Sequence, residues 1–171
     1  KKYKFLRPKD MFINSGIKGK MDNKKDDLRF FFYKDFPDNS TFDPVRVKKL
    51  EQNFNRKPSS INLIPVISVT KFIKIAYDFF KSTDSIHFMN LDIEGMEYEI
   101  CECFFGDKVF PWVICVEEIG YTAENIKSSN LYKLMENNNY FLASKTFLSS
   151  IYISKDKLSF LPSPYLKELI K

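Results

Sequence analysis

The feature that most constrains the fold is a regular alternation of strand-like and helix-like segments between residues 64 and 154 of this 171-residue chain. Short apolar runs predict strands at 64–69, 85–92, 112–117, 140–145 and 150–154. Helical spacing of apolar residues predicts helices at 71–81, directly after Asp92, and at 130–137. Alternation of this kind favours an α/β fold in which helices cover both faces of a mostly parallel sheet. The last two strands are joined by a short loop and must be antiparallel.

The first sixty residues are more polar and are interrupted by turns. They predict strands at 11–17 and 28–33 and a helix at 45–53 that begins after Asp43 and Pro44. Thr70 is a candidate cap for the helix at 71–81, and a small helix is predicted at 165–170. The length matches one domain, so residues 1–171 are predicted to form a single domain.

Composition narrows the classes of function. The 27 basic and 22 acidic residues give a net charge of +5, and the lysines are scattered, which favours a solvated surface over a nucleic-acid interface. The aromatic content of 16% is interpreted as core packing. No apolar run approaches the ~18 residues of a membrane span, and the N-terminal residues do not resemble a signal peptide.

The cysteines and the single histidine give no metal-ligand pattern. The chain has three cysteines, Cys101, Cys103 and Cys115, so they cannot all form disulfides within the chain. One residue separates Cys101 from Cys103, whereas the C-x-x-C motif of redox and zinc sites has two. Free thiols are typical of a reducing compartment, so the expected location is cytoplasmic.

The residues that point to chemistry lie between Leu91 and Glu97. Asp92 follows an apolar strand, Gly95 allows a tight turn, and a helix begins at once. Ligands of open α/β sheets bind beyond the carboxyl ends of the strands, so Asp92 and Glu94 are candidate catalytic carboxylates. A carboxylate there can take a proton from a hydroxyl, hold an ammonium group or bind a hard cation. Glu97 and Glu99 are interpreted as favouring a helix N-terminus.

A second carboxylate pair, Glu117 and Glu118, ends the next apolar strand. If the two strands are neighbours, Asp92 and Glu117 open onto the same crevice. Side chains alternate along a strand, so only one of the pair can face Asp92. Glu117 continues the strand directly and is the favoured one.

Two motifs resemble the FkbM-type methyltransferase family. They are the D-x-E-G-x-E turn from Asp92 to Glu97 and the P-x-V-I-x-V-E strand from Pro111 to Glu117. The resemblance covers roughly residues 60–155. It implies a Rossmann-like, three-layer fold that binds S-adenosylmethionine and methylates a hydroxyl of a glycan or small metabolite.

The resemblance also assigns roles to particular residues. Asp92 and Glu94 become the expected catalytic residues, and Glu117 and Glu118 the expected acceptor-binding residues. The expected cofactor contacts are Asp92, Gly95 and Asn14. The family's D-x-G-A/C-x-x-G cofactor turn is absent from this sequence. We therefore expect the first βαβ unit to be missing, so that this is either part of a longer protein or a remnant that binds no cofactor.

Two alternatives belong to other classes. The chain could be a non-catalytic methyltransferase-like module that binds a partner or self-associates through exposed sheet edges. A third interpretation makes Asp92 and Glu94 a metal-binding D-x-E pair of a nucleotide-sugar enzyme.

Overall fold

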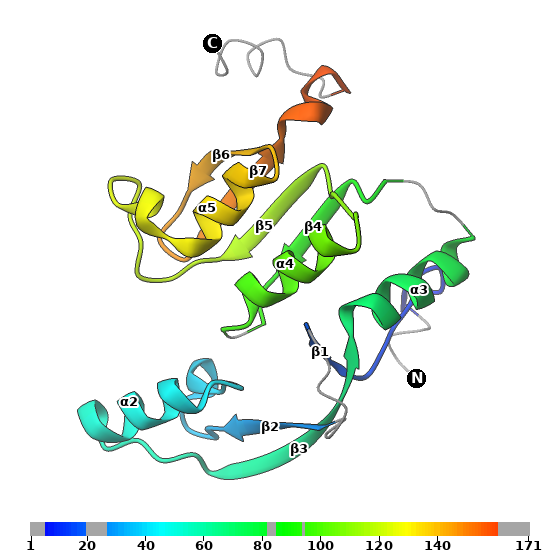
Figure 1. The fold of residues 1–171 in the computed structure, drawn as a ribbon. Coiled ribbons are helices and arrows are strands. Elements are labelled where there is room, and N and C mark those ends of the chain that lie inside the picture. The colour runs from blue at the N-terminus through cyan, green and yellow to red at the C-terminus, as the bar shows by residue number, and fades with distance from the viewer. Residues whose placement is uncertain (1–5, 20–26, 82–84, 94, 161–171) are drawn as a thin grey trace. The chain divides into compact units, whose positions relative to one another are not determined.

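The chain folds into two compact units, unit 1 (Lys1–Thr83) and unit 2 (Asp84–Lys171). The computed structural model describes residues 6–19, 27–81, 85–93 and 95–160. Each unit has its own mixed sheet and its own helices (Figure 1). The predicted α/β class is therefore confirmed.

Unit 1 contains a three-stranded sheet in the order β1-β3-β2. Its strands are β1 (Gly16–Lys18), β2 (Asp27–Phe32) and β3 (Ser60–Ser68). The central strand β3 is parallel to β1 and antiparallel to β2. Pro65 precedes the stretch of β3 that pairs with β1, so its missing N–H removes no bond to that strand.

Local capping signals fix the helices of unit 1. These are a short 3₁₀ turn η1 (Pro37–Asn39), α2 (Pro44–Phe54) and α3 (Val69–Phe80). Asp43 caps α2 by accepting a 2.7 Å hydrogen bond from the Val45 amide. The cap of α3 is Ser68, whose hydroxyl accepts from the Lys71 amide at 3.1 Å. The predicted cap Thr70 is wrong, because the helix begins one residue before it.

Unit 2 contains a four-stranded sheet in the order β4-β5-β7-β6. Its strands are β4 (Phe88–Leu91), β5 (Val113–Glu117), β6 (Tyr140–Lys145) and β7 (Ser149–Ser154). β4 and β5 are parallel, whereas β7 is antiparallel to both β5 and β6. The predicted antiparallel pair at the end of the chain is thus confirmed for β6 and β7.

Two helices of unit 2 lie on the same side of its sheet (Figure 1). They are α4 (Glu97–Gly106) and α5 (Asn130–Asn137), which contact each other. The 3₁₀ turns η2 (Ile126–Ser128) and η3 (Lys155–Phe160) flank this layer in the sequence. The core beneath the helices contains apolar side chains that are almost completely buried: Ile100, Phe104, Ile114, Val116 and Met135.

Two details of the fold prediction need correction. The sheets are mixed rather than mostly parallel, since three of the five strand pairings are antiparallel. In the described part of unit 2 the helices cover one face of the sheet. The predicted strand at 11–17 reduces to Gly16–Lys18, and the helix predicted at 165–170 lies outside the described residues. Within the described ranges, no helix has the length and apolar character to cross a bilayer.

Candidate functional site

The carboxyl ends of β4 and β5 lie side by side at one edge of the unit 2 sheet. Leu91, which ends β4, pairs with Val116, and Glu117 ends β5. Asp92 therefore follows at the register position of Glu117, one strand spacing of about 5 Å away. This adjacency is the condition on which the prediction of a shared crevice depended.

Strand alternation places Glu117 on the sheet face away from the helices, because Val116 before it in β5 is buried. Asp92 follows the buried Leu91 directly after β4 ends. Asp92 is exposed and Glu117 is half-buried. The edge thus carries two carboxylates within reach of solvent.

The turn after β4 is held by Glu97, the first residue of α4. Its carboxylate is buried and accepts hydrogen bonds from the Ile93 amide at 3.1 Å and from the Gly95 amide at 3.0 and 3.2 Å. Gly95 has φ +110°, a conformation that favours glycine. Glu97 was predicted only to favour the N-terminus of the helix. In the structure it also fixes the backbone that follows Asp92.

Glu118 turns to the helix side and is almost completely buried. Its carboxylate accepts hydrogen bonds from the hydroxyls of Ser150 at 2.6 Å, Tyr152 at 2.9 Å and Ser129. The Ser129 hydroxyl also caps α5 by accepting from the Leu131 and Tyr132 amides. Burial, and next the Glu118 carboxylate, raises the pKa of Tyr152, so this phenol remains a donor.

This network separates the roles of the two neighbouring glutamates. Glu118 joins the end of β5 to β7 and the start of α5, while Glu117 lies on the opposite sheet face. The role of either glutamate in binding an acceptor stays a prediction. The partners of Glu118, which are Ser129, Ser150 and Tyr152, were not predicted from the sequence. The signal was present in β7, where Ser150 and Tyr152 occupy alternate positions and so share one face.

Comparison with known proteins gives no relative: no family model, no curated protein and no solved structure matches this chain. The geometry of the sheet edge and the two sequence motifs therefore remain the features that bear on function.

The other predicted site residues are distributed as follows. Gly95 lies in the turn held by Glu97, and Glu94 lies outside the described residues. Asn14 is exposed and belongs to unit 1, so its contact with a cofactor stays a prediction. Within the described residues, no three His, Cys, Asp or Glu side chains gather in a way that could hold a metal ion.

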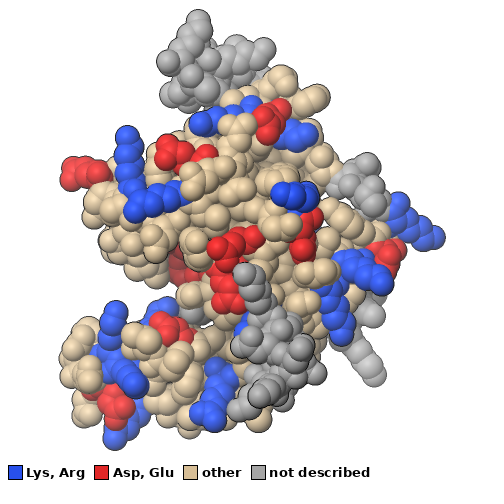
Figure 2. All heavy atoms as spheres, in the orientation of Figure 1, with Lys and Arg blue, Asp and Glu red and all other residues tan. Residues whose placement is uncertain are grey.

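Charged side chains of both signs are mixed on the surface. On the visible face of each unit, Lys and Arg side chains are interspersed with Asp and Glu (Figure 2).

Proposed function

We propose that this chain is a segment of an S-adenosylmethionine-dependent O-methyltransferase that methylates a hydroxyl of a glycan or small metabolite. The observation that carries the proposal is the pairing of Leu91 with Val116 in two adjacent parallel strands, which brings the next residues, Asp92 and Glu117, to the same end of the sheet. These are the positions at which α/β enzymes bind their ligands. The D-x-E-G-x-E turn and the P-x-V-I-x-V-E strand, which meet at this edge, support the same proposal.

The residues at the edge fit the acceptor better than the cofactor. Carboxylates suit the hydroxyl groups of an acceptor, and the rigid turn at Gly95 lets a ligand approach the backbone closely. The chain lacks the Gly-rich turn that the resemblance implies for the cofactor. The described residues therefore do not account for cofactor binding by themselves.

Asp92 is the proposed base or orienting group. An exposed carboxylate beyond β4 can accept a hydrogen bond from the acceptor hydroxyl and take its proton when the oxygen forms its new bond. Glu117 can bind a second hydroxyl of the same acceptor, and Glu94 completes the proposed catalytic pair. Glu97 contributes by holding the backbone after Asp92 in one conformation, which limits the loss of alignment on binding.

The test uses the full-length gene product and compares Asp92→Asn with the matched variant Asp156→Asn. Asp156 is exposed and follows the end of β7. Because β7 is antiparallel to β5, this residue lies at the other end of the strands from Asp92 and Glu117. Isothermal titration of the full-length product with S-adenosylmethionine should show binding. Asp92→Asn should lower the rate of methyl transfer by about 10²-fold or more, and Asp156→Asn should leave it unchanged. Absence of cofactor binding by the full-length product would contradict the proposal.

A second candidate function is a non-catalytic module that binds a partner or a second copy. The observation in its favour is in β3, where Ile61 is 57% and Leu63 is 66% exposed. Large apolar side chains in a row on a strand are typical of interaction surfaces. Sedimentation equilibrium tests this candidate, and a strictly monomeric protein over the micromolar range would count against it.

We also propose a reducing, cytoplasmic location. The three cysteines are free thiols, and Cys101 is buried. Burial, with the carboxylates of Glu97 and Glu118, raises the pKa of Cys101 to about 12. A protonated thiol of this kind is unreactive and needs no partner.

A further inference from the structure

We infer that the acceptor carries an aromatic or aliphatic group next to its reacting hydroxyl, and that Phe147, with Ile119 and Leu148, binds this group. The inference rests on the proposed function, because it describes the ligand of the same sheet edge. Its evidence is independent and comes from the turn between β6 and β7.

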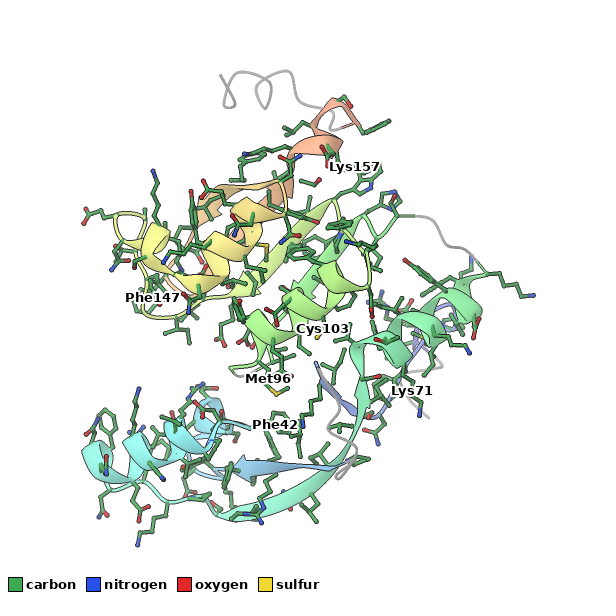
Figure 3. The ribbon with its side chains drawn as sticks, in the orientation of Figure 1. Phe42, Lys71, Met96, Cys103, Phe147 and Lys157 are labelled. Carbon is green, nitrogen blue, oxygen red and sulfur yellow. The ribbon has the colours of Figure 1, made fainter. Side chains whose placement is uncertain are left out.

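The turn is closed tightly and leaves its apolar side chains in solvent. The Thr146 amide donates to the Ser149 carbonyl at 2.8 Å, and the Ser149 amide donates to the Thr146 hydroxyl at 3.0 Å. Phe147 is 90% exposed and Leu148 is 48% exposed. Figure 3 labels Phe147 at the tip of this turn. Two adjacent apolar side chains exposed on a rigid turn contribute little to the core and form the centre of an apolar patch, the kind of surface at which ligands bind.

The turn is attached to the segment that carries Glu117. The Glu118 amide donates to the Leu148 carbonyl at 2.8 Å, and Lys145 Nζ donates to the carbonyls of Glu118 and Thr146 at 2.9 and 3.0 Å. Glu117 pairs with Ser149 across the ladder. The backbone of the turn is therefore held next to the end of β5 and two strand spacings, about 10 Å, from the end of β4.

Ile119 is a third exposed apolar side chain near this turn, since the Glu118 amide before it donates to the Leu148 carbonyl. It follows Glu118 directly and is 50% exposed, and the backbone then turns at Gly120 with φ +88°. Ile119, Phe147 and Leu148 are called the apolar rim below. The rim lies beside the carboxylates, so a ligand that contacts both needs a hydroxyl group and an apolar body.

The size of the rim favours a small ligand over a second protein. Three partly exposed side chains offer roughly 400 Å² or less, whereas each partner in a standard protein interface contributes about 800 Å². A hydroxyl compound with one ring or a short aliphatic chain matches this area.

The test compares two glucosides that share their hydroxyl groups and differ in one substituent. Phenyl β-glucoside and methyl β-glucoside are titrated into the whole chain without cofactor, and backbone amide shifts are followed by NMR. We expect the phenyl compound to shift the amides of residues 117–120 and 146–149 and to bind about tenfold more tightly than the methyl compound.

Phe147→Ser should abolish this preference, and Phe147→Tyr should retain it. The matched variant is Phe88→Ser. Phe88 is 61% exposed and begins β4, so it lies at the other end of the strands from Asp92 and Glu117. The inference is overturned if the chain binds the two glucosides equally or binds neither. It is also overturned if Phe147→Ser and Phe88→Ser reduce the affinity for the phenyl compound equally.

The experiment separates this inference from the proposed function. A Phe147-dependent preference, together with a full-length gene product that transfers no methyl group, supports the apolar rim and rejects the enzyme. Methyl transfer that is indifferent to Phe147→Ser supports the enzyme and rejects the rim.

Discussion

At the scale of single residues, the two adjacent glutamates at the end of β5 show how neighbours acquire separate tasks. Glu117 is the half-buried last residue of the strand, and Glu118 is buried among hydroxyl groups. A buried carboxylate is costly unless its oxygens accept hydrogen bonds, and three hydroxyl donors meet that requirement. Glu118 is therefore a structural residue that fixes the end of the strand on which Glu117 stands.

We predict that Glu118→Gln lowers the free energy of unfolding by about 1–3 kcal/mol. The glutamine amide is neutral and accepts only through its oxygen, so at least one of the three hydroxyls loses its acceptor and the others lose the charge of theirs. The measurement is urea denaturation followed by circular dichroism. Glu136→Gln, at an exposed position of α5, is the control and should stay within about 0.5 kcal/mol of the wild type. Equal stability of the two variants would show that the network adds nothing.

The sequence identified the individual residues of the edge but not their partners. Asp92 and Glu117 were found because each follows a recognisable apolar run, which is a local signal. The bonds of Glu118 to Ser150 and Tyr152 span more than thirty residues. They depend on β7 returning beside β5, which no local pattern determines.

At the scale of elements, the connection between β4 and α4 is the most constrained segment of unit 2. Glu97 accepts from two backbone amides within four residues of itself, and Gly95 adopts a positive φ. A tight strand-to-helix turn requires this spacing of Gly and Glu, whatever the function of the protein. Backbone geometry therefore explains part of the motif on which the family resemblance is based.

We predict opposite effects for alanine at two glycines that flank α4. Gly95→Ala forces a side chain into a positive φ and should cost about 1–2 kcal/mol. Gly106→Ala, at the end of α4, meets no atom within 4 Å and should be neutral or stabilising by up to about 1 kcal/mol. Thermal denaturation of both variants measures the difference. A Gly95→Ala protein as stable as Gly106→Ala would mean that the turn adapts without strain.

Helices were easier to predict than sheets in this chain. Asp43 and Ser129 mark the starts of α2 and α5 through bonds to the next few amides, and such signals are visible in the sequence. The mixed character of the sheets was missed. Strand direction is set by pairing between β2 and β3 or between β5 and β7, and these pairings are not local.

At the scale of the whole molecule, the division into two units bears on the predicted single domain of residues 1–171. Each unit has its own sheet, and each sheet has its own helices. A unit with its own core can open without the other, because cooperative unfolding follows the contacts that are lost together.

We therefore predict that a core substitution in one unit affects that unit alone. Ile114→Ala removes a fully buried side chain of β5 and should cost about 2–5 kcal/mol. Hydrogen exchange measured by mass spectrometry should then show faster exchange in β4–β7 and unchanged exchange in β2 and β3. The reciprocal variant, Ile73→Ala in α3, should reverse the pattern. Loss of protection in both units from either variant would instead establish one cooperative domain.

The place of β7 in its sheet has a consequence for how the protein is made. β7 is the last strand of the sheet in chain order, yet it lies between β5 and β6. At about 5–20 residues per second of synthesis, Glu117 precedes Ser149 by on the order of a few seconds. During that interval the nascent chain presents β5 with one edge unpaired, and an open edge of Val, Ile and Cys is a template for unwanted pairing. Translation speed between these residues, and the chaperones that meet the emerging chain, therefore influence the yield of correctly folded protein.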